Sequence, residues 1–306
     1  MLSGIGLAKE GLPCNDLRVR RLILWWIIGL ALAPAGWAQL EVRLGVERDN
    51  FVRHEPVIVD VFIDSNHNRA VILGDAPGWI RFSVRNGRGF PVNQTPGRRL
   101  PGGGLFVLSS RKSVVKAFNL APFFDFSEPG EYTIQASIAT KNWAKVRFEC
   151  PPVKIQVVRA KVLGVLRRGM ASVVPGEPPE VRRYTLQTTR VKGKSHLFLR
   201  VSDDHEPSFK IYNVEPLGMM VHHAKPRFAL DADGNSHVFF QCHQRQYFYC
   251  KIGPLGKLKE RKTYFSDKVR PFMYQDVKGV FKVMSGRRVV VDSDFPAPRI
   301  RSRKNR

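Results

Sequence analysis

Short runs in which apolar and polar residues alternate constrain this chain more than any other feature. Over more than a hundred residues after position 39, runs such as PVIVDVFID and EYTIQASIA are separated by Gly, Pro, Asn and Asp. A period of two places successive side chains on opposite faces of a strand, and helical periodicity is nearly absent. Turn residues recur about every 8 to 12 positions, as in two-sheet sandwiches. The sequence therefore predicts an all-β fold.

The stretch SEPGEYTIQAS is the most specific piece of this region. A turn at Pro129 and Gly130 leads to Tyr132 on an alternating strand. This arrangement resembles the turn and tyrosine that precede a late strand in immunoglobulin-like domains of secreted bacterial modules. The resemblance implies an immunoglobulin-like β-sandwich over residues 39–160. The paired cysteines of antibody domains are missing from the sequence, which excludes that subfamily.

A second β pattern begins after residue 181, and it repeats. GKSHLFLRV at 193–201 and GNSHVFFQC at 234–242 share Gly, Ser, His and Phe at a spacing of 41 residues. Two PLG stretches follow at a spacing of 38, and RPFMYQDVKGVFKVM has the turn and strand order of a third, degraded copy. A period of about 40 to 45 residues built from short strands is typical of propeller blades. The sequence predicts two to three blade-like units over 182–295.

Proline and glycine separate the two patterns in VVPGEPPEV, and we predict an interdomain linker over residues 161–181. Beyond it, ALDADGNSHVFFQ followed by YFYCKIGPLGKL resembles the blade repeats of bacterial sialidase-like and other secreted propellers. The resemblance implies a propeller-type arrangement. A closed ring usually takes at least about four blades. The terminal units must therefore be covered by the sandwich, by neighbouring segments of the chain, or by a second chain in a homodimer.

The N-terminus has the order of an export signal. Arg18, Arg20 and Arg21 precede an apolar run of 12 residues at 22–33, and small residues follow up to Ala38. We predict a signal peptide at 1–38 and a secreted or periplasmic mature chain without a transmembrane segment. An uncleaved membrane anchor is the alternative, but the run is shorter than the roughly 18 residues that a spanning helix needs.

Charge indicates the kind of partner. The chain has 50 Lys+Arg against 26 Asp+Glu, a formal charge of +24, and residues 296–306 form a basic tail. Such a surplus bears on partners and solubility and not on the fold. We expect a protein or an anionic polymer of the cell envelope as the partner, and no specific nucleic acid.

Aromatic and basic residues lie side by side in HQRQYFYCK. Arg245, Tyr247, Tyr249 and Lys251 are the candidate ligand-binding residues, because aromatic rings beside cations can stack on sugars or bases. Alternate residues of the same run must fill the core of the blade.

The turn DADGN is a candidate metal loop. Asp231, Asp233 and Asn235 have the one-residue spacing that can place oxygens around Ca²⁺. No carboxylate follows at the far end of the loop, which favours the alternative, a β-turn that uses Asp and Gly for its backbone angles. We therefore expect no cofactor, with Ca²⁺ as the alternative.

Three cysteines remain after the predicted signal peptide, in a compartment where disulfides persist. Cys242 and Cys250 flank HQRQYFY, and Cys150 lies alone before two prolines. A Cys242–Cys250 disulfide across a hairpin is one interpretation. Two small hydrophobic residues on adjacent strands is the other.

No sequence motif indicates a reaction. Gly-x-Ser-x-Gly, the P-loop and His-Glu-x-x-His are all missing from the sequence. His196 and His237 recur at equivalent positions of the repeat, which favours a structural role such as bonding a neighbouring turn. The preferred hypothesis is a secreted, non-catalytic binding or adhesion module. A structural or assembly subunit and a sialidase-like glycoside hydrolase are the alternatives.

Overall fold

The computed structural model describes residues 40–297, except 75–77, 99, 101–103, 141–145, 172–175, 177 and 205–209. The fold is all-β, as predicted, and the described residues contain no helix. Consequently no helix in this part is long and apolar enough to cross a membrane. The predicted signal peptide at 1–38 and most of the basic tail lie outside the described residues.

The first ten strands form the predicted immunoglobulin-like sandwich. One sheet has the order β1-β3-β7 and the other the order β2-β10-β8-β5, with β9 beside β8 and a separate β4-β6 pair. The strands are β1 (Leu40–Val46), β2 (Asn50–Val52), β3 (Ile58–Ser65), β4 (Val71–Leu73), β5 (Ile80–Asn86), β6 (Phe106–Leu108), β7 (Ser113–Asn119), β8 (Gly130–Ala139), β9 (Arg147–Glu149) and β10 (Val153–Val158).

Tyr132 begins the buried side of strand β8, where every second side chain enters the sandwich core. Its hydroxyl donates a hydrogen bond to the carbonyl oxygen of Glu128 at 2.8 Å. A tyrosine that bonds the backbone a few residues upstream is the corner of immunoglobulin-like domains. The turn and tyrosine in SEPGEYTIQAS therefore have the role that their resemblance implied.

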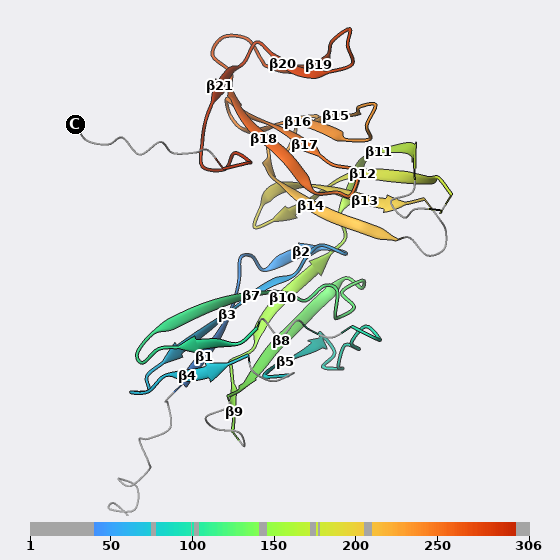
Figure 1. Cartoon of the computed structure of the whole chain (residues 1–306). Coiled ribbons are helices and arrows are strands. Elements are labelled where there is room, and N and C mark those ends of the chain that lie inside the picture. Colours follow the sequence, from blue (N-terminus) through green and yellow to red (C-terminus); the bar gives the residue numbers. More distant parts are fainter. Residues whose placement is uncertain are drawn as a thin grey trace, which may run out of the picture.

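The remaining strands form small antiparallel sheets arranged as in a propeller (Figure 1). One sheet has the order β11-β12-β13-β14, the next the order β15-β16-β17-β18-β21, and β19 and β20 form a hairpin. The strands are β11 (Lys161–Met170), β12 (Glu180–Val191), β13 (Lys194–Asp203), β14 (Ile211–Met220), β15 (Arg227–Leu230), β16 (Ser236–His243), β17 (Gln246–Ile252), β18 (Leu258–Phe265), β19 (Phe272–Gln275), β20 (Phe281–Met284) and β21 (Arg287–Val289).

The predicted linker at 161–181 is wrong for residues 161–170 and for residues 180–181, which begin β12. Residues 161–170 form β11, which pairs antiparallel with β12 from Lys161 opposite Thr188 to Met170 opposite Glu180. Valine and leucine in this segment favour a strand, and the proline-rich run begins only at Pro175. The junction between the sandwich and the first C-terminal sheet is therefore short, and we propose the two-unit division as an interpretation of the fold.

Three apolar layers lie one after another through the C-terminal part. Val52 of the sandwich contacts Phe198 and Val214 of the first sheet. A larger core fills the space between the first and second sheets. Beyond the second sheet, Phe239 lies in a third layer with Met273 of the hairpin β19-β20. The sandwich and the hairpin thus cover the two outer faces from within the chain.

The residues aligned at a spacing of 41 face one another across the middle layer. Leu197 and Val238 both lie in the core between the two sheets. Phe198 and Phe239 point to opposite outer layers. The similarity at this spacing therefore belongs to two alike hairpins in neighbouring small sheets, which share one apolar core.

Candidate functional site

The turn between β15 and β16 is organised by one carboxylate. Oδ1 of Asp231 accepts the backbone N–H groups of Asp233 at 3.0 Å and Asn235 at 2.8 Å. Gly234 has φ +74°, a left-handed backbone conformation that glycine adopts without steric cost. This is the Asp/Gly β-turn favoured from the sequence.

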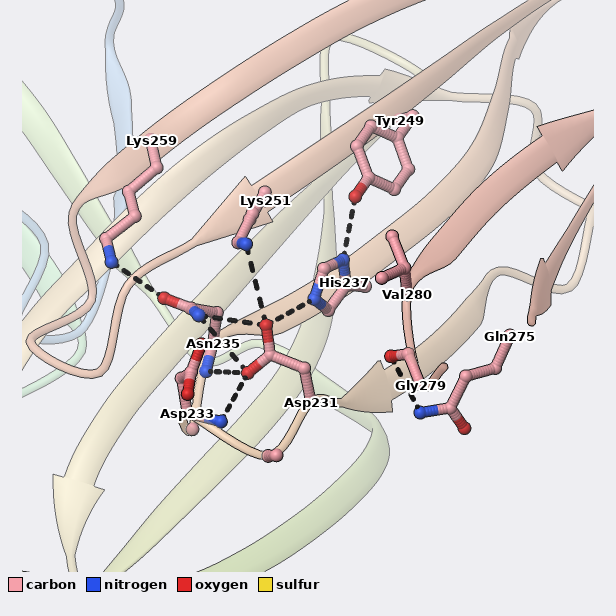
Figure 2. A network of polar contacts seen from close by, with 12 residues as sticks. Asp231, Asp233, Asn235, His237, Tyr249, Lys251, Lys259, Gln275, Gly279 and Val280 are labelled. Atoms are coloured by element: carbon pink, nitrogen blue, oxygen red, sulfur yellow. Dashed lines mark hydrogen bonds and ion pairs between the residues drawn. The ribbon is translucent and has the colours of Figure 1, made fainter. Parts of the chain in front are cut away.

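Asp231 is also the first member of a chain of hydrogen-bonded polar side chains (Figure 2). Its Oδ2 lies 3.0 Å from Nε2 of His237, and Nδ1 of His237 lies 2.8 Å from the hydroxyl of Tyr249. His237 is 3 % exposed. The pattern fits a neutral imidazole that donates through Nε2 to the carboxylate and accepts the tyrosine O–H at Nδ1. His237 bonds a neighbouring turn, the structural role expected from its recurrence.

The protonation states follow from burial and hydrogen bonding. Burial raises the pKa of Asp231, but hydrogen bonds from His237 and Asn235 outweigh it, so the pKa falls to about 2. Burial lowers the pKa of His237, against the opposing effect of Asp231. Burial raises the pKa of Tyr249. A protonated tyrosine beside a neutral histidine is a packing element and a weak nucleophile.

Both oxygens of Asp231 face N–H donors, which is the opposite of what a cation requires. Asn235 donates through Nδ2 to Oδ2 at 2.9 Å, and Lys251 Nζ lies 3.5 Å from the same oxygen. Asn235 Oδ1 in turn accepts from Lys259 at 2.8 Å. Within the described part of the chain no group of three or more His, Cys, Asp or Glu side chains could hold a metal ion. The arrangement of Asp231 and Asn235 gives no support to the Ca²⁺ alternative.

The network forms the floor of an open cleft between the second sheet and the hairpin β19-β20, which we call the lysine cleft. Its volume is about 600 Å³. Lys262 forms an ion pair with Glu260 at 2.6 Å and Lys282 one with Asp276 at 2.7 Å, so the charge of these cations is largely neutralised. The residues that line the cleft include four lysines and no arginine: Lys251, Lys262, Lys278 and Lys282.

The structure separates the four candidate ligand-binding residues. Tyr247 and Tyr249 are 4 % and 6 % exposed and lie in the layer under the hairpin. Arg245 is exposed at the β16-β17 turn and donates from Nε to the carbonyl oxygen of Ser266 at 2.9 Å. Lys251 lies at the lysine cleft beside Asp231. They do not form one exposed face, because the hairpin β19-β20 covers the aromatic pair.

The Cys242–Cys250 disulfide, one of the two interpretations of the sequence, is absent from the structure, and both thiols are free. Cys250 lies opposite Val238 in the β16-β17 ladder, and the pairing is irregular between Gln241 and His243, where Cys242 stands. Both cysteines lie in the core between the two sheets, as the alternative interpretation expected. The register thus places Val238, and not Cys242, opposite Cys250.

A second cavity has a different electrostatic character, and we call it the basic pocket. It has a volume of about 660 Å³ and lies between the first sheet and the β14-β15 loop. This size is within the range of about 300 to 1,000 Å³ that is usual for small-molecule sites. Leu186, Met220 and Phe228 form its apolar part, and Leu163 lies at its exposed side.

The cations of the basic pocket have no acidic neighbours in its wall. Asp and Glu do not occur among the residues that line it, all of which the structure describes. The cations come from three separate segments and are all exposed: Arg159, Lys161, Arg190 and Lys225. Unneutralised cations around an apolar floor favour an anionic ligand.

A serine and a histidine meet in the same pocket. Oγ of Ser195 lies 3.0 Å from Nδ1 of His222, and the ring of His223 lies 4.7 Å from that of His222. The positive charge of Arg190 lowers the pKa of His222. A base among cations binds a proton weakly, so the Ser195–His222 pair is poorly suited to generating a nucleophile and well suited to binding an anion.

Comparisons with known proteins leave the family open. No family model and no curated protein matches the chain. Among solved structures, the chain is similar to the periplasmic chaperone SfaE, with 12 % identity over 72 % of this chain and 96 % of that one and a TM-score of 0.23. It is also similar to the Salmonella enterica SafA pilin in complex with the SafB chaperone, with 10 % identity, 74 % and 96 % coverage and a TM-score of 0.24.

The YadV chaperone gives similar figures, with 9 % identity, 71 % and 96 % coverage and a TM-score of 0.23. TM-scores this low carry no argument about the function of the present chain. The three similar structures are of chaperones or a chaperone complex and not of sialidase-like repeats.

Proposed function

We propose that this protein is a non-catalytic module that binds an anionic ligand in the basic pocket. The single observation that carries the proposal is the set of four exposed cations around one cavity without a lining carboxylate. Each charge-assisted hydrogen bond to such a ligand contributes about 1.5 to 3 kcal/mol. The formal charge of +24 further attracts anions by long-range steering.

The cell envelope is the proposed setting. The basic, apolar and small-residue order of residues 1–38 supports export, and a secreted or periplasmic protein meets anionic polymers and other proteins there. We propose no catalytic role. In the lysine cleft Tyr249 is protonated and His237 is neutral, and in the basic pocket the lowered pKa of His222 makes it a weak base.

Calorimetric titration with inorganic polyphosphate tests the proposal. Replacement of Lys161 and Arg190 by glutamine should weaken binding at least about tenfold, because two charge-assisted contacts are lost. Replacement of Lys257 and Lys268 by glutamine removes the same charge at exposed positions outside the pocket and is the matched control. Equal losses in the two double variants would show diffuse attraction by net charge and would overturn the proposed site.

An assembly role is the second candidate, and a specific surface favours it. The hairpin β19-β20 and its turn expose Phe272, Val277, Val280 and Met284, with Val277 fully exposed. A second copy could cover this end of the stack and form a homodimer. Light scattering at increasing protein concentration tests this role, and a mass that stays at that of one chain contradicts it.

A further inference from the structure

The basic pocket has two different halves. Three of its four cations, Arg159, Lys161 and Arg190, lie where β10 leads into β11 and where β12 ends, and the fourth, Lys225, lies on the β14-β15 loop. The other side is apolar: Leu186 is 1 % and Met220 6 % exposed, and Phe228 is half-buried. A fully hydrated inorganic anion would use only the first half.

We propose that the natural ligand of the basic pocket is an amphipathic anion, a single phosphate or carboxylate group on an unbranched apolar chain. The head group binds among Lys161 and Arg190, and the chain lies over Met220 and Phe228 towards Leu163. This inference rests on the proposed function and names the ligand class of the same site.

Two features of the wall of the basic pocket favour a ligand with a polar head group at one end and an apolar chain at the other. His222 and Ser195 hydrogen-bond each other at 3.0 Å next to Arg190, so neutral donors stand beside the cations. Leu163 remains 39 % exposed at the pocket although it is a large apolar side chain on strand β11. Covering Leu163 with a ligand chain removes apolar surface from water, which a purely polar anion cannot do.

A chain-length series distinguishes this ligand class from a simple anion. We would titrate the purified protein with inorganic phosphate and with butyl, hexyl and octyl phosphate below their micelle concentrations. Affinity should rise roughly threefold to fourfold for each added methylene group that becomes buried. Octanoate in parallel identifies the preferred head group, and octanol measures the contribution of the chain alone.

Single substitutions separate the two halves. Leu163→Ser should weaken octyl phosphate binding at least about fivefold and leave inorganic phosphate unchanged, because only the chain contacts that side. Arg190→Gln should weaken both ligands. Lys268→Gln, an exposed cation outside the pocket, is the control and should change neither.

The experiments distinguish a failure of the amphipathic ligand class from a failure of the proposed anion-binding function. If all the phosphates bind with the same affinity and Arg190→Gln still weakens them, the pocket is a simple anion site and the amphipathic ligand is refuted while the proposed function stands. If octanol binds as tightly as octyl phosphate, the cations have no role, and both the inference and the proposed function fail.

Discussion

Asp231 and Asp276, 45 residues apart, hold the same turn in the hairpins β15-β16 and β19-β20. Each carboxylate accepts the backbone N–H groups two and four residues further on, at 2.8 to 3.0 Å. The residue six positions on then contacts the carboxylate in both: His237 at 3.0 Å and Lys282 at 2.7 Å. The third, degraded copy expected from the sequence is thus present in its turn.

The two carboxylates are similarly exposed, at 12 % and 16 %, but the partner His237 is 4 % exposed and the partner Lys282 54 %, so we predict a difference in their contribution to stability. Asp231→Ala removes the carboxylate and leaves two backbone N–H groups and His237 without their hydrogen-bond acceptor. It should lower the free energy of unfolding by about 2 to 4 kcal/mol, and Asp276→Ala should lower it clearly less, because its partner Lys282 is exposed. Denaturant titrations followed by circular dichroism measure both. Equal costs would show that burial of the partner His237 is unimportant.

The pKa of His237 should respond to Asp231. Because burial holds the pKa of His237 below its usual 6.5, the unfolded chain binds a proton more readily than the folded one. The contribution of this group to stability is therefore complete above about pH 6.5 and falls as the pH drops from there towards the lower folded pKa.

Asp231→Asn keeps an oxygen for the turn but removes the charge that supports a protonated imidazole, so the pKa of His237 should fall further. NMR titration of the imidazole signals in wild type and variant measures this directly. A rise in the pKa would mean that the carboxylate does not face the ring.

Phe239 should behave as a core residue under the hairpin β19-β20. It is 4 % exposed, and its ring stacks on that of Tyr247 at a centroid distance of 5.5 Å. Phe239→Ala should reduce the free energy of unfolding of the C-terminal part by about 3 to 5 kcal/mol. Phe90→Ala, at a side chain that is 63 % exposed, is the control and should cost less than about 0.5 kcal/mol. A similar small cost at Phe239 would remove the hairpin from the core.

The core cysteines should be unreactive in the folded protein. Burial raises the pKa of Cys242 to about 12 and that of Cys250 to about 11, so neither forms a thiolate near neutral pH. Iodoacetamide at pH 8 should label them only in denaturant, as peptide mapping would show. A disulfide-linked peptide that contains both cysteines would contradict the free thiols of the structure.

Proteolysis should nick the chain without separating its parts. Elastase is expected to cut after Ala171 or Val173, next to the proline-rich run. Because β11 lies before this site and pairs with β12 after it, the fragments should stay together on gel filtration and separate only in denaturant. Two pieces that separate under native conditions would show that β11 belongs to a linker.

Much of the fold was fixed by local patterns that need no distant partner. Alternation gave the strands, the Pro129–Gly130 turn gave the corner of Tyr132, and Asp with Gly gave the turn at Asp231. Such patterns are readable because strand periodicity and turn chemistry depend on residues only a few positions apart.

Tertiary structure decided what covers each face and which remote segments meet. The sequence placed Tyr247 and Tyr249 on one face of a strand, but only the packing of the hairpin β19-β20 made that face interior. Pairing register kept Cys242 from Cys250, and pairing with β12 turned residues 161–170 into a strand. The basic pocket, assembled from segments around 159–164, 186–195 and 220–228, has no signature in any one of them, because its charge and its apolar floor combine only when the sheets pack.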